Sequence, residues 1–483
     1  MFYNRLKKLM VSTLAIFISF SCLVSSPIKA IAAKDYEAEA EARKNITIES
    51  NLTDNWPQGP VIGAQSAILM EVNSGTILYE KNIHEELYPA SITKILTALI
   101  AVEKCDLNEM VTFSDAAVHS INWKEDANIG INVGNQITME ECLYGLLVGS
   151  ANEVAYAMAE HISGSVEEFA VLMNEKAKEL GCTHSNFVTP NGIHDNNHYT
   201  SAHDMALIAQ AFFSNELLSK MSSTVSYHIP QTATQPRDDM IVWAKSKLLP
   251  GKEYTYDSLV GTKTGYTTEA RQTLVSCAEK NGLKLVCVVL MEEAPYQFED
   301  TVSLFNYGFE NFRPYSIADN DTNYNVDSDN FFASDTDFFG SSKPIMQLDT
   351  EDYIVLPTNA DFDDTVSELT YEGLEKNEIA RIEYRFNNVY VGYGSIVPIE
   401  DEQAVFDFGT KHTLASKPVQ EQKTIYINVK NIIICVILIS FLLMLLFMLK
   451  SFISNVRKSR RRSRIMNKHK GSTKHLDWKN FKP

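Results

Sequence analysis

Alternation of apolar and polar residues predicts that one sheet is built from both ends of the central part of the chain. Strand-like runs form two predicted hairpins, in residues 66–79 and 273–291, and the second turns at Asn281-Gly282, a strong hairpin signal. Between them, in residues 91–218, apolar residues recur at helical spacing. Residues 59–315 are therefore expected to form an antiparallel sheet flanked by helices, with a helical block inserted into it.

Four flanking segments differ in composition from this central part. Residues 34–58 are polar and acidic, which predicts a flexible lead-in, and residues 316–344 are rich in Asp, Asn and Ser, which is typical of a linker. Short alternating runs in residues 345–399 predict a small all-β domain, and residues 400–430 would form a stalk. The predicted fold class is α/β with a small all-β C-terminal domain.

Both ends of the chain carry apolar runs. Residues 1–33 combine a basic start, an apolar stretch and small residues up to Ala32 and Ala33, which predicts a secretory signal peptide cleaved there; an uncleaved anchor is the alternative. Residues 431–449 hold an uncharged apolar run. As a helix this run would be about 27 Å long, close to the thickness of a bilayer core. We therefore expect a transmembrane helix there.

Basic residues after this run predict the orientation in the membrane. Residues 450–483 contain twelve Lys or Arg and one acidic residue. Because positively charged flanks stay in the cytoplasm, we expect a single-pass protein of the cell membrane whose body lies on the extracytoplasmic side. The tail would hold to the inner membrane face by its charge.

Charge and cysteine content exclude two classes of site. The chain has 61 Asp or Glu against 43 Lys or Arg, a net charge of −18, and the body is more acidic still because the tail is basic. A nucleic-acid partner would require a basic surface and is therefore not expected. The seven cysteines show no close pairing and no CxxC spacing, so neither a disulfide framework nor a zinc site is predicted.

The first candidate for chemistry is Ser91-Ile92-Thr93-Lys94, which follows Pro89 at the start of a helical pattern. Residues three apart share a helix face, so the Lys94 amine can reach the Ser91 hydroxyl. A serine is a poor nucleophile until a base takes its proton, and a lysine whose pKa is lowered by burial and by the helix N-terminus can be that base. The spacing alone is a weak signal, because Ser26-Pro27-Ile28-Lys29 repeats it inside the predicted signal peptide.

A second motif, Ser150-Ala151-Asn152, follows an apolar stretch. The Ser150 hydroxyl could relay a proton to a leaving group, and the Asn152 side chain could hold a substrate amide. The alternative is a helix cap, where Ser and Asn are preferred.

A third motif, Lys263-Thr264-Gly265, lies in a strand-like run. Lys263 and Thr264 could bind a substrate carboxylate, Gly265 would let a substrate backbone approach, and the next amide, that of Tyr266, could donate to an oxyanion. Each motif alone is ordinary, but the three in this order form the set described for penicillin-binding proteins and class A β-lactamases.

Longer runs around these motifs resemble the D-alanyl-D-alanine carboxypeptidases, a group of low-molecular-mass penicillin-binding proteins. The similar runs are residues 90–94, 147–153, 187–192, 198–204 and 261–267. The resemblance is dense over about residues 60–312 and looser over 345–399. It implies a β-lactamase/DD-peptidase-like fold with the small β-domain that such enzymes carry.

The resemblance also implies a reaction. The chain would remove the terminal D-alanine from peptidoglycan pentapeptides through an acyl-enzyme on Ser91, with Lys94 as the base. The oxyanion would be held by the backbone amides of Ser91 and Tyr266. Penicillin, which mimics the substrate, would acylate Ser91 almost irreversibly, so the expected ligands are stem peptides and β-lactams, with no cofactor.

Four further residues would take supporting roles in this reaction. Ser150 would shuttle the proton and Asn152 would position the substrate, while Lys263 and Thr264 would bind the terminal carboxylate. The bare backbone of Gly265 would admit the substrate.

Three features depart from the family pattern or compete with it. Arg271 stands where the family usually has glycine and could bind a carboxylate or face solvent, and Ser246 stands in place of a usual asparagine. His194, His198 and His203 lie close together, but their run lacks the HExxH glutamate of zinc peptidases, so no metal is predicted.

Three other functions use the same sequence features. A β-lactamase shares the serine chemistry but needs a deacylating base, and no ExxLN element lies between the second and third motifs. A non-catalytic wall-binding protein would have no chemical need for both Ser91 and Lys94. A transpeptidase of strand synthesis would usually carry a larger second domain.

Overall fold

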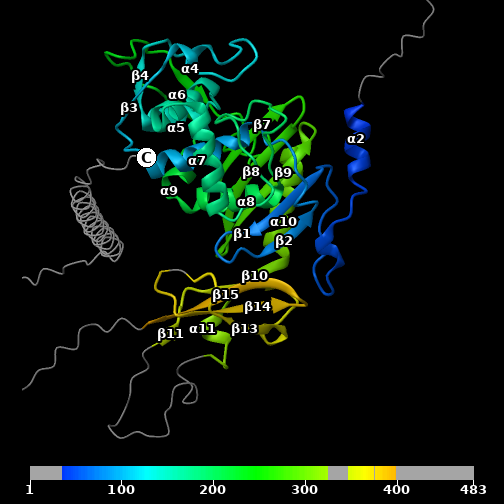
Figure 1. Ribbon diagram of the computed structural model, residues 1–483. Helices are drawn as coiled ribbons and strands as arrows, with labels where there is room; N and C mark the ends of the chain where they lie inside the picture. Colours follow the sequence, from blue (N-terminus) through cyan, green and yellow to red (C-terminus); the bar gives the residue numbers. More distant parts are fainter. Residues whose placement is uncertain (1–34, 325–345, 375, 399–483) are drawn as a thin grey trace, which may run out of the picture. The chain divides into compact units, whose positions relative to one another are not determined.

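A five-stranded antiparallel sheet lies at the centre of the computed structural model, which describes residues 35–324, 346–374 and 376–398 (Figure 1). The strand order is β2-β1-β9-β8-β7. The strands are β1 (Ser66–Glu71), β2 (Ile77–Lys81), β7 (Leu259–Thr267), β8 (Arg271–Lys280) and β9 (Leu283–Glu292). Both ends of the domain contribute strands, which confirms the prediction from alternation.

The turn between β8 and β9 shows why the hairpin signal was reliable. Asn281 and Gly282 have φ angles of 54° and 80°. Two successive residues in the left-handed region match the right-handed twist of the flanking strands, and Asn and Gly adopt this region at the lowest steric cost. The predicted hairpin is therefore confirmed.

A block of helices separates β2 from β7, as the helical periodicity predicted. It contains η2 (Ala90–Thr93), α3 (Lys94–Lys104), α4 (Asp115–His119), α5 (Met139–Leu147), α6 (Asn152–Ser163), α7 (Val166–Glu179), α8 (Ala202–Ser214) and α9 (Glu216–Ser222). Two short strand pairs accompany the helices: β3 (Met110–Thr112) with β4 (Gln136–Thr138), and β5 (Ser226–His228) with β6 (Ile241–Trp243).

The central sheet is buried on both faces, because alternate residues of its strands join two different cores. In β9, Val286 and Val288 pack with the helical block, whereas Leu285 and Cys287 pack with α10 (Tyr296–Asn311) on the other face. A strand directs successive side chains to opposite faces, so a continuous apolar run is what a doubly covered strand requires. The layered arrangement places η2 (Ala90–Thr93), which leads into α3, directly against the sheet.

A second sheet of six strands forms the C-terminal all-β region, in agreement with the predicted fold class. Its strands are β10 (Phe312–Ser316), β11 (Met346–Leu348), β12 (Tyr353–Pro357), β13 (Val366–Thr370), β14 (Ala380–Phe386) and β15 (Val389–Pro398), with the short helices α11 (Ile317–Asn320) and η3 (Phe362–Asp364). Strand β10 continues directly from α10, so this sheet also uses residues that precede the segment assigned to it from the sequence.

The lead-in and the first described residues of the linker, both predicted to be irregular, contain short helices and buried side chains. The lead-in contains α2 (Tyr36–Arg43) and η1 (Glu49–Leu52), and Trp56 is buried and donates its indole N–H to the Leu78 carbonyl at 3.0 Å. The start of the predicted linker includes Asp321, which is buried and accepts a hydrogen bond of 2.6 Å from the Tyr384 hydroxyl. Both segments depend on partners distant in sequence, so local composition gave no sign of their order.

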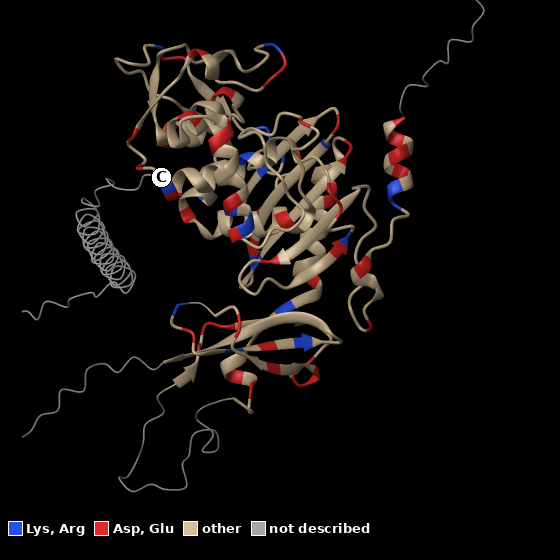
Figure 2. Cartoon of the chain, viewed as in Figure 1, with Lys and Arg blue, Asp and Glu red and all other residues tan. Residues whose placement is uncertain are grey.

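Several predicted segments lie outside the described residues. These are the signal peptide (1–33), most of the linker, the stalk (400–430), the transmembrane helix (431–449) and the basic tail (450–483). Among the residues that the structure describes, no helix has the length and apolar character needed to cross a bilayer. Acidic positions outnumber basic ones over this part of the chain (Figure 2), and its five cysteines are all unpaired.

The contact between Tyr353 and Glu71 can be tested by mutation. Glu71 is fully buried in β1 and accepts a hydrogen bond of 2.8 Å from the Tyr353 hydroxyl in β12. We expect Tyr353→Phe to lower the free energy of unfolding by about 1–3 kcal/mol, because a buried carboxylate loses a donor. Tyr371→Phe, at an exposed tyrosine, is the matched control. Urea unfolding measures both, and equal changes in the two variants would show that the contact contributes nothing.

Candidate active site

Ser91 lies where the helical block meets the sheet. Its short helix η2 leads into α3 and packs against β7 and β8, and Thr273 of β8 donates its hydroxyl to the Pro89 carbonyl at 2.8 Å. Gly265 of β7 lies so close that a Cβ there would come within 2.9 Å of the Ser91 nitrogen. The close approach of β7 to the serine therefore requires glycine at this position.

Lys94 is completely buried beneath Ser91. Its Nζ lies 2.8 Å from Ser91 Oγ, 2.7 Å from Asn152 Oδ1 and 2.6 Å from the Asn191 carbonyl oxygen. Burial, reinforced by the nearby charge of Lys263, holds the pKa of Lys94 well below that of a free lysine. An amine in this setting can be uncharged near neutral pH and can accept the proton of the serine hydroxyl.

Ser150 connects the site to a second buried lysine, Lys263 of β7. The Lys263 Nζ donates to Ser150 Oγ and to the Thr264 carbonyl, both at 2.8 Å. Burial lowers the pKa of Lys263 to about 7, and the charge of Lys245 adds to this effect. Ser150, between α5 and α6, has a φ of 58°, a strained conformation for a serine that aims its hydroxyl at the lysine.

A cleft of about 560 Å³ opens over these groups. Of the residues predicted from the sequence, it is lined by Ser91, Ser150, Asn152, Thr264, Gly265 and Tyr266. Lys94 and Lys263 lie beneath its surface and reach the cleft through the two serine hydroxyls. The structure thus brings all eight predicted site residues into one region.

The loop between α7 and α8 closes the site from the helical side. Gly192 has a φ of 77°, and a Cβ there would lie 1.9 Å from the Ala90 carbonyl oxygen. His198, one of the three clustered histidines, lies 2.8 Å from Thr93 Oγ1 through Nε2 and accepts from the Val188 amide at 3.0 Å through Nδ1. Burial lowers the pKa of His198 to about 4, so this ring is neutral and fastens the loop to η2.

Three functional groups were not recognised from the sequence. The Asn191 carbonyl is a backbone atom, which a residue pattern does not reveal. Lys245 lines the cleft, and its charge lowers the pKa of Lys263, while Glu153 is fully buried and accepts from the Ile129 amide at 2.7 Å. Burial raises the pKa of Glu153 to about 7. Glu153 follows the Ser150-Ala151-Asn152 motif directly, and Lys245 precedes Ser246, which was noted as a departure from the family pattern. These neighbours were the available sequence signal for the two residues.

Arg271 and Ser246, the two departures from the family pattern, lie at the edge of the site. Ser246 Oγ lies 3.2 Å from Thr262 Oγ1 of β7. Arg271 forms an ion pair with Glu293, with its Nη2 2.5 Å from Oε2. Arg271 is thus neither a free carboxylate-binding group nor directed to solvent. The ion pair with Glu293 shows that both roles suggested from the sequence were wrong.

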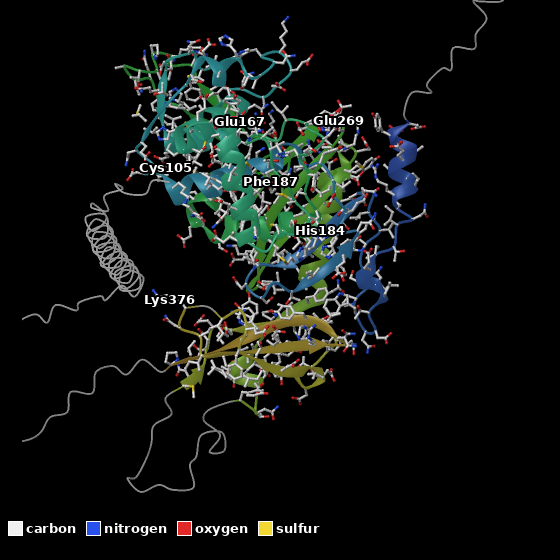
Figure 3. The ribbon with its side chains drawn as sticks, viewed as in Figure 1. Cys105, Glu167, His184, Phe187, Glu269 and Lys376 are labelled. Carbon is white, nitrogen blue, oxygen red and sulfur yellow. The ribbon has the colours of Figure 1, made fainter. Side chains whose placement is uncertain are left out.

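One group of side chains in the described residues could hold a metal ion. The ligand atoms of Cys105, Glu109 and His161 lie within 4.8 Å of one another. They belong to the C-terminal ends of α3 and α6 and to the turn before β3, whereas the catalytic candidates occupy the N-terminal ends of the same helices. Cys105 accordingly lies far from Glu269, which lines the cleft (Figure 3). This group takes no part in the serine site.

Comparison with known proteins identifies related sequences. The D-alanyl-D-alanine carboxypeptidase family profile matches residues 53–294. D-alanyl-D-alanine carboxypeptidase DacF of Bacillus subtilis is 33% identical over 263 residues, which cover 53% of this chain and 64% of the relative. DacB2 of Mycobacterium tuberculosis is 30% identical over 260 residues, 52% of this chain and 84% of the relative. The chain thus spans slightly less than two thirds of the Bacillus protein.

The fold has a counterpart among solved structures. Penicillin binding protein 5 from Haemophilus influenzae superposes with a TM-score of 0.55 at 24% sequence identity, over 71% of this chain and 98% of the other. At this identity the likeness concerns the fold, which is the DD-peptidase fold.

A mutation of Gly192 tests the close approach of the α7–α8 loop to the Ala90 carbonyl. Gly192→Ala should lower the free energy of unfolding by about 3 kcal/mol or more, because it combines a left-handed conformation with a clash against the Ala90 carbonyl. Gly251→Ala is the matched control: Gly251 has a φ of 75° with nothing near its would-be Cβ, so we expect only about 1–2 kcal/mol. Denaturant unfolding of both variants gives the comparison, and equal losses would rule out the clash.

Proposed function

Because this chain belongs to the D-alanyl-D-alanine carboxypeptidase family, we propose that it removes the terminal D-alanine from peptidoglycan pentapeptides through an acyl-enzyme on Ser91. One observation carries the proposal: the fully buried Lys94 amine lies 2.8 Å from the Ser91 hydroxyl, at the floor of a cleft. A serine beside an uncharged amine is an activated nucleophile.

Acylation begins when Ser91 Oγ attacks the carbonyl carbon of the penultimate D-alanine while Lys94 takes the hydroxyl proton. The tetrahedral oxyanion is held by the backbone amides of Ser91 and Tyr266, which lie on η2 and on β7 at the cleft. Donors of this kind contribute about 3–4 kcal/mol each to the transition state. The close approach of β7 that Gly265 permits is what brings the two amides together.

The leaving group needs a proton, and the substrate needs an anchor for its terminal carboxylate. Ser150, 2.8 Å from Lys263 Nζ, relays to the departing D-alanine nitrogen the proton that Lys94 took from Ser91, so Lys94 is again uncharged and Lys263 keeps its charge. Lys263 and Thr264 bind the carboxylate, and Asn152 holds the substrate amide while it keeps Lys94 in place. Binding of a carboxylate favours the charged form of Lys263, so its depressed pKa rises when substrate enters the site.

Water then hydrolyses the ester on Ser91 and frees the enzyme. A β-lactam presents a strained amide and a carboxylate to the same groups, and its ring-opened adduct stays tethered, so the enzyme is inhibited by penicillin. A β-lactamase and a non-catalytic wall-binding protein are other outcomes, and the fate of this adduct separates them. A transpeptidase, the third, would form the same adduct and would differ in transferring the peptide acyl group to an amine instead of water.

The end segments support a location for this activity. The apolar run and small residues of residues 1–33 are those of a signal peptide, and the uncharged run at 431–449 is followed by a strongly basic tail. We propose that the catalytic region works on the extracytoplasmic side of the cell membrane, held there by a single C-terminal helix. A substrate in the cell wall requires this topology.

Release of D-alanine from a peptide ending in D-Ala-D-Ala tests the function. Ser91→Ala should reduce the rate by about 10³-fold or more, because the nucleophile is removed. Ser214→Ala, at an exposed serine at the end of α8, is the control and should retain the wild-type rate.

Each other result points to a different conclusion. Release that persists in Ser91→Ala would show that another group is the nucleophile. Absence of release together with rapid penicillin turnover would indicate a β-lactamase, and absence of both release and acylation would leave a wall-binding role.

The pH dependence of acylation follows from the two lysines. The second-order rate constant for acylation by penicillin should fall on the acidic side as Lys94 gains a proton, and above about pH 7 as Lys263 loses the charge that binds the carboxylate. Arginine stays protonated, so Lys263→Arg should move the alkaline fall to higher pH, whatever its absolute rate. Stopped-flow with a fluorescent penicillin measures both profiles. Superimposable alkaline limbs would contradict the role of Lys263.

A further inference from the structure

The end of β7 and the turn between β7 and β8 form one wall of the cleft. Tyr266 and Thr267, the last residues of β7, and Glu269 of the turn line the cleft, and Arg271 closes the turn as the first residue of β8, paired with Thr267. The Arg271 guanidinium contacts Glu293 through Nε at 3.0 Å and Nη2 at 2.5 Å. A guanidinium with two donors on one carboxylate has a defined orientation as well as a favourable energy.

Helix α2, far away in sequence, covers the other side of this guanidinium. The Tyr36 ring lies 3.7 Å from Arg271 Cζ, and the Tyr266 ring lies 5.7 Å from it on the cleft side. Arg271 therefore contacts both a residue of α2 and the residue whose amide is the proposed oxyanion donor. Cation–π contacts of arginine are strongest when the group is shielded from water, and this side chain is only 17% exposed.

A second arginine fastens α2 to the same carboxylate. Arg43, in the last turn of α2, is buried and donates through Nε to the Gly63 carbonyl at 2.8 Å. Its Nη2 lies 3.6 Å from Glu293 Oε1. Glu293 thus joins the two arginines: Arg271 at the β7–β8 turn and Arg43 at the C-terminal end of α2, while Tyr36 at the other end of α2 contacts Arg271.

The contacts of the Arg271 side chain offset the conformational strain of its own backbone. Its φ is 55°, in the left-handed region that glycine adopts freely and other residues adopt at about 1–2 kcal/mol. A glycine would make the turn without strain and without any attachment to α2. With arginine at this position the backbone is strained, and the ion pair with Glu293 and the contact with the Tyr36 ring offset that strain.

We propose that Tyr36 and Arg271 are positioning residues through which α2 holds the β7–β8 turn, and with it the Tyr266 amide, in the geometry for acylation of Ser91. The inference rests on the proposed function, since it concerns the transition state of that reaction. Figure 3 shows Glu269, in the same turn, on the side of the domain that faces α2.

The test uses Tyr36→Ala and Arg271→Gly in the full chain, with Tyr36→Phe as the conservative variant. Arg271→Gly removes the side chain and leaves a backbone that tolerates the observed φ, so it reports the lost contacts and not added strain. We expect the acylation rate constant for a fluorescent penicillin to fall about tenfold in both, because a displaced oxyanion donor weakens the transition state. Tyr36→Phe keeps the aromatic face and should acylate at the wild-type rate.

Two further measurements separate positioning from a general loss of stability. Hydrogen exchange of residues 266–271 should become faster in Tyr36→Ala, while the exchange of α8 and the melting temperature stay unchanged. Lys44→Ala, at an exposed residue that pairs with Glu41 beside α2, is the matched control and should alter neither rate.

If Tyr36→Ala is acylated at the wild-type rate, the proposal is wrong, whatever the hydrogen-exchange rate of residues 266–271. It is also wrong if the acylation rate constant of Tyr36→Phe is as low as that of Tyr36→Ala. Failure of the proposed function is distinguishable, because the wild-type protein would then release no D-alanine from a peptide ending in D-Ala-D-Ala.

Discussion

The site depends on one buried amine. Lys94 Nζ lies within 2.8 Å of three oxygens, which come from η2, from the start of α6 and from the loop before α8. An ammonium without access to water is costly, and the chain meets this cost by surrounding the nitrogen with acceptors and by lowering its pKa. Because the three acceptors belong to separate segments, Lys94 joins three parts of the helical block at the site.

A second buried lysine, Lys263, makes it still less favourable for Lys94 to carry a proton. Lys263 is also buried, and its charge lowers the pKa of Lys94, while Lys245 in the cleft wall lowers the pKa of both. With Lys94 uncharged, the positive charges of Lys263 and Lys245 favour a ligand that brings negative charge, as a peptide C-terminus or a β-lactam carboxylate does. Glu125, Asp126 and Glu269 line the same cleft, so an anionic ligand would bind at its lysines and away from these carboxylates.

The N-terminal segment changes how the molecule is understood. The polar composition of residues 34–58 predicted a flexible lead-in. In the structure Arg43 and Trp56 are buried, and Tyr36 stacks on Arg271 at the rim of the cleft. The sequence pattern missed this because α2 has four Glu or Arg positions in eight residues and no apolar stripe. Its stability comes from ion pairs and stacking with residues more than two hundred positions away.

What the sequence determined by itself is the local part of the structure and the chemistry. The Asn281-Gly282 turn, the serine and lysine one helical turn apart in residues 91–94, and the apolar alternation of β9 each follow from backbone sterics over a few residues, and the three motifs named the family. Tertiary structure decided what those residues meet: the Asn191 carbonyl at Lys94, Lys263 at Ser150, and the pairing of Arg271 with Glu293 beside Tyr36. The reason is physical, since burial and charge pairing depend on segments brought together from across the chain, and these are what set a pKa or hold a strained turn.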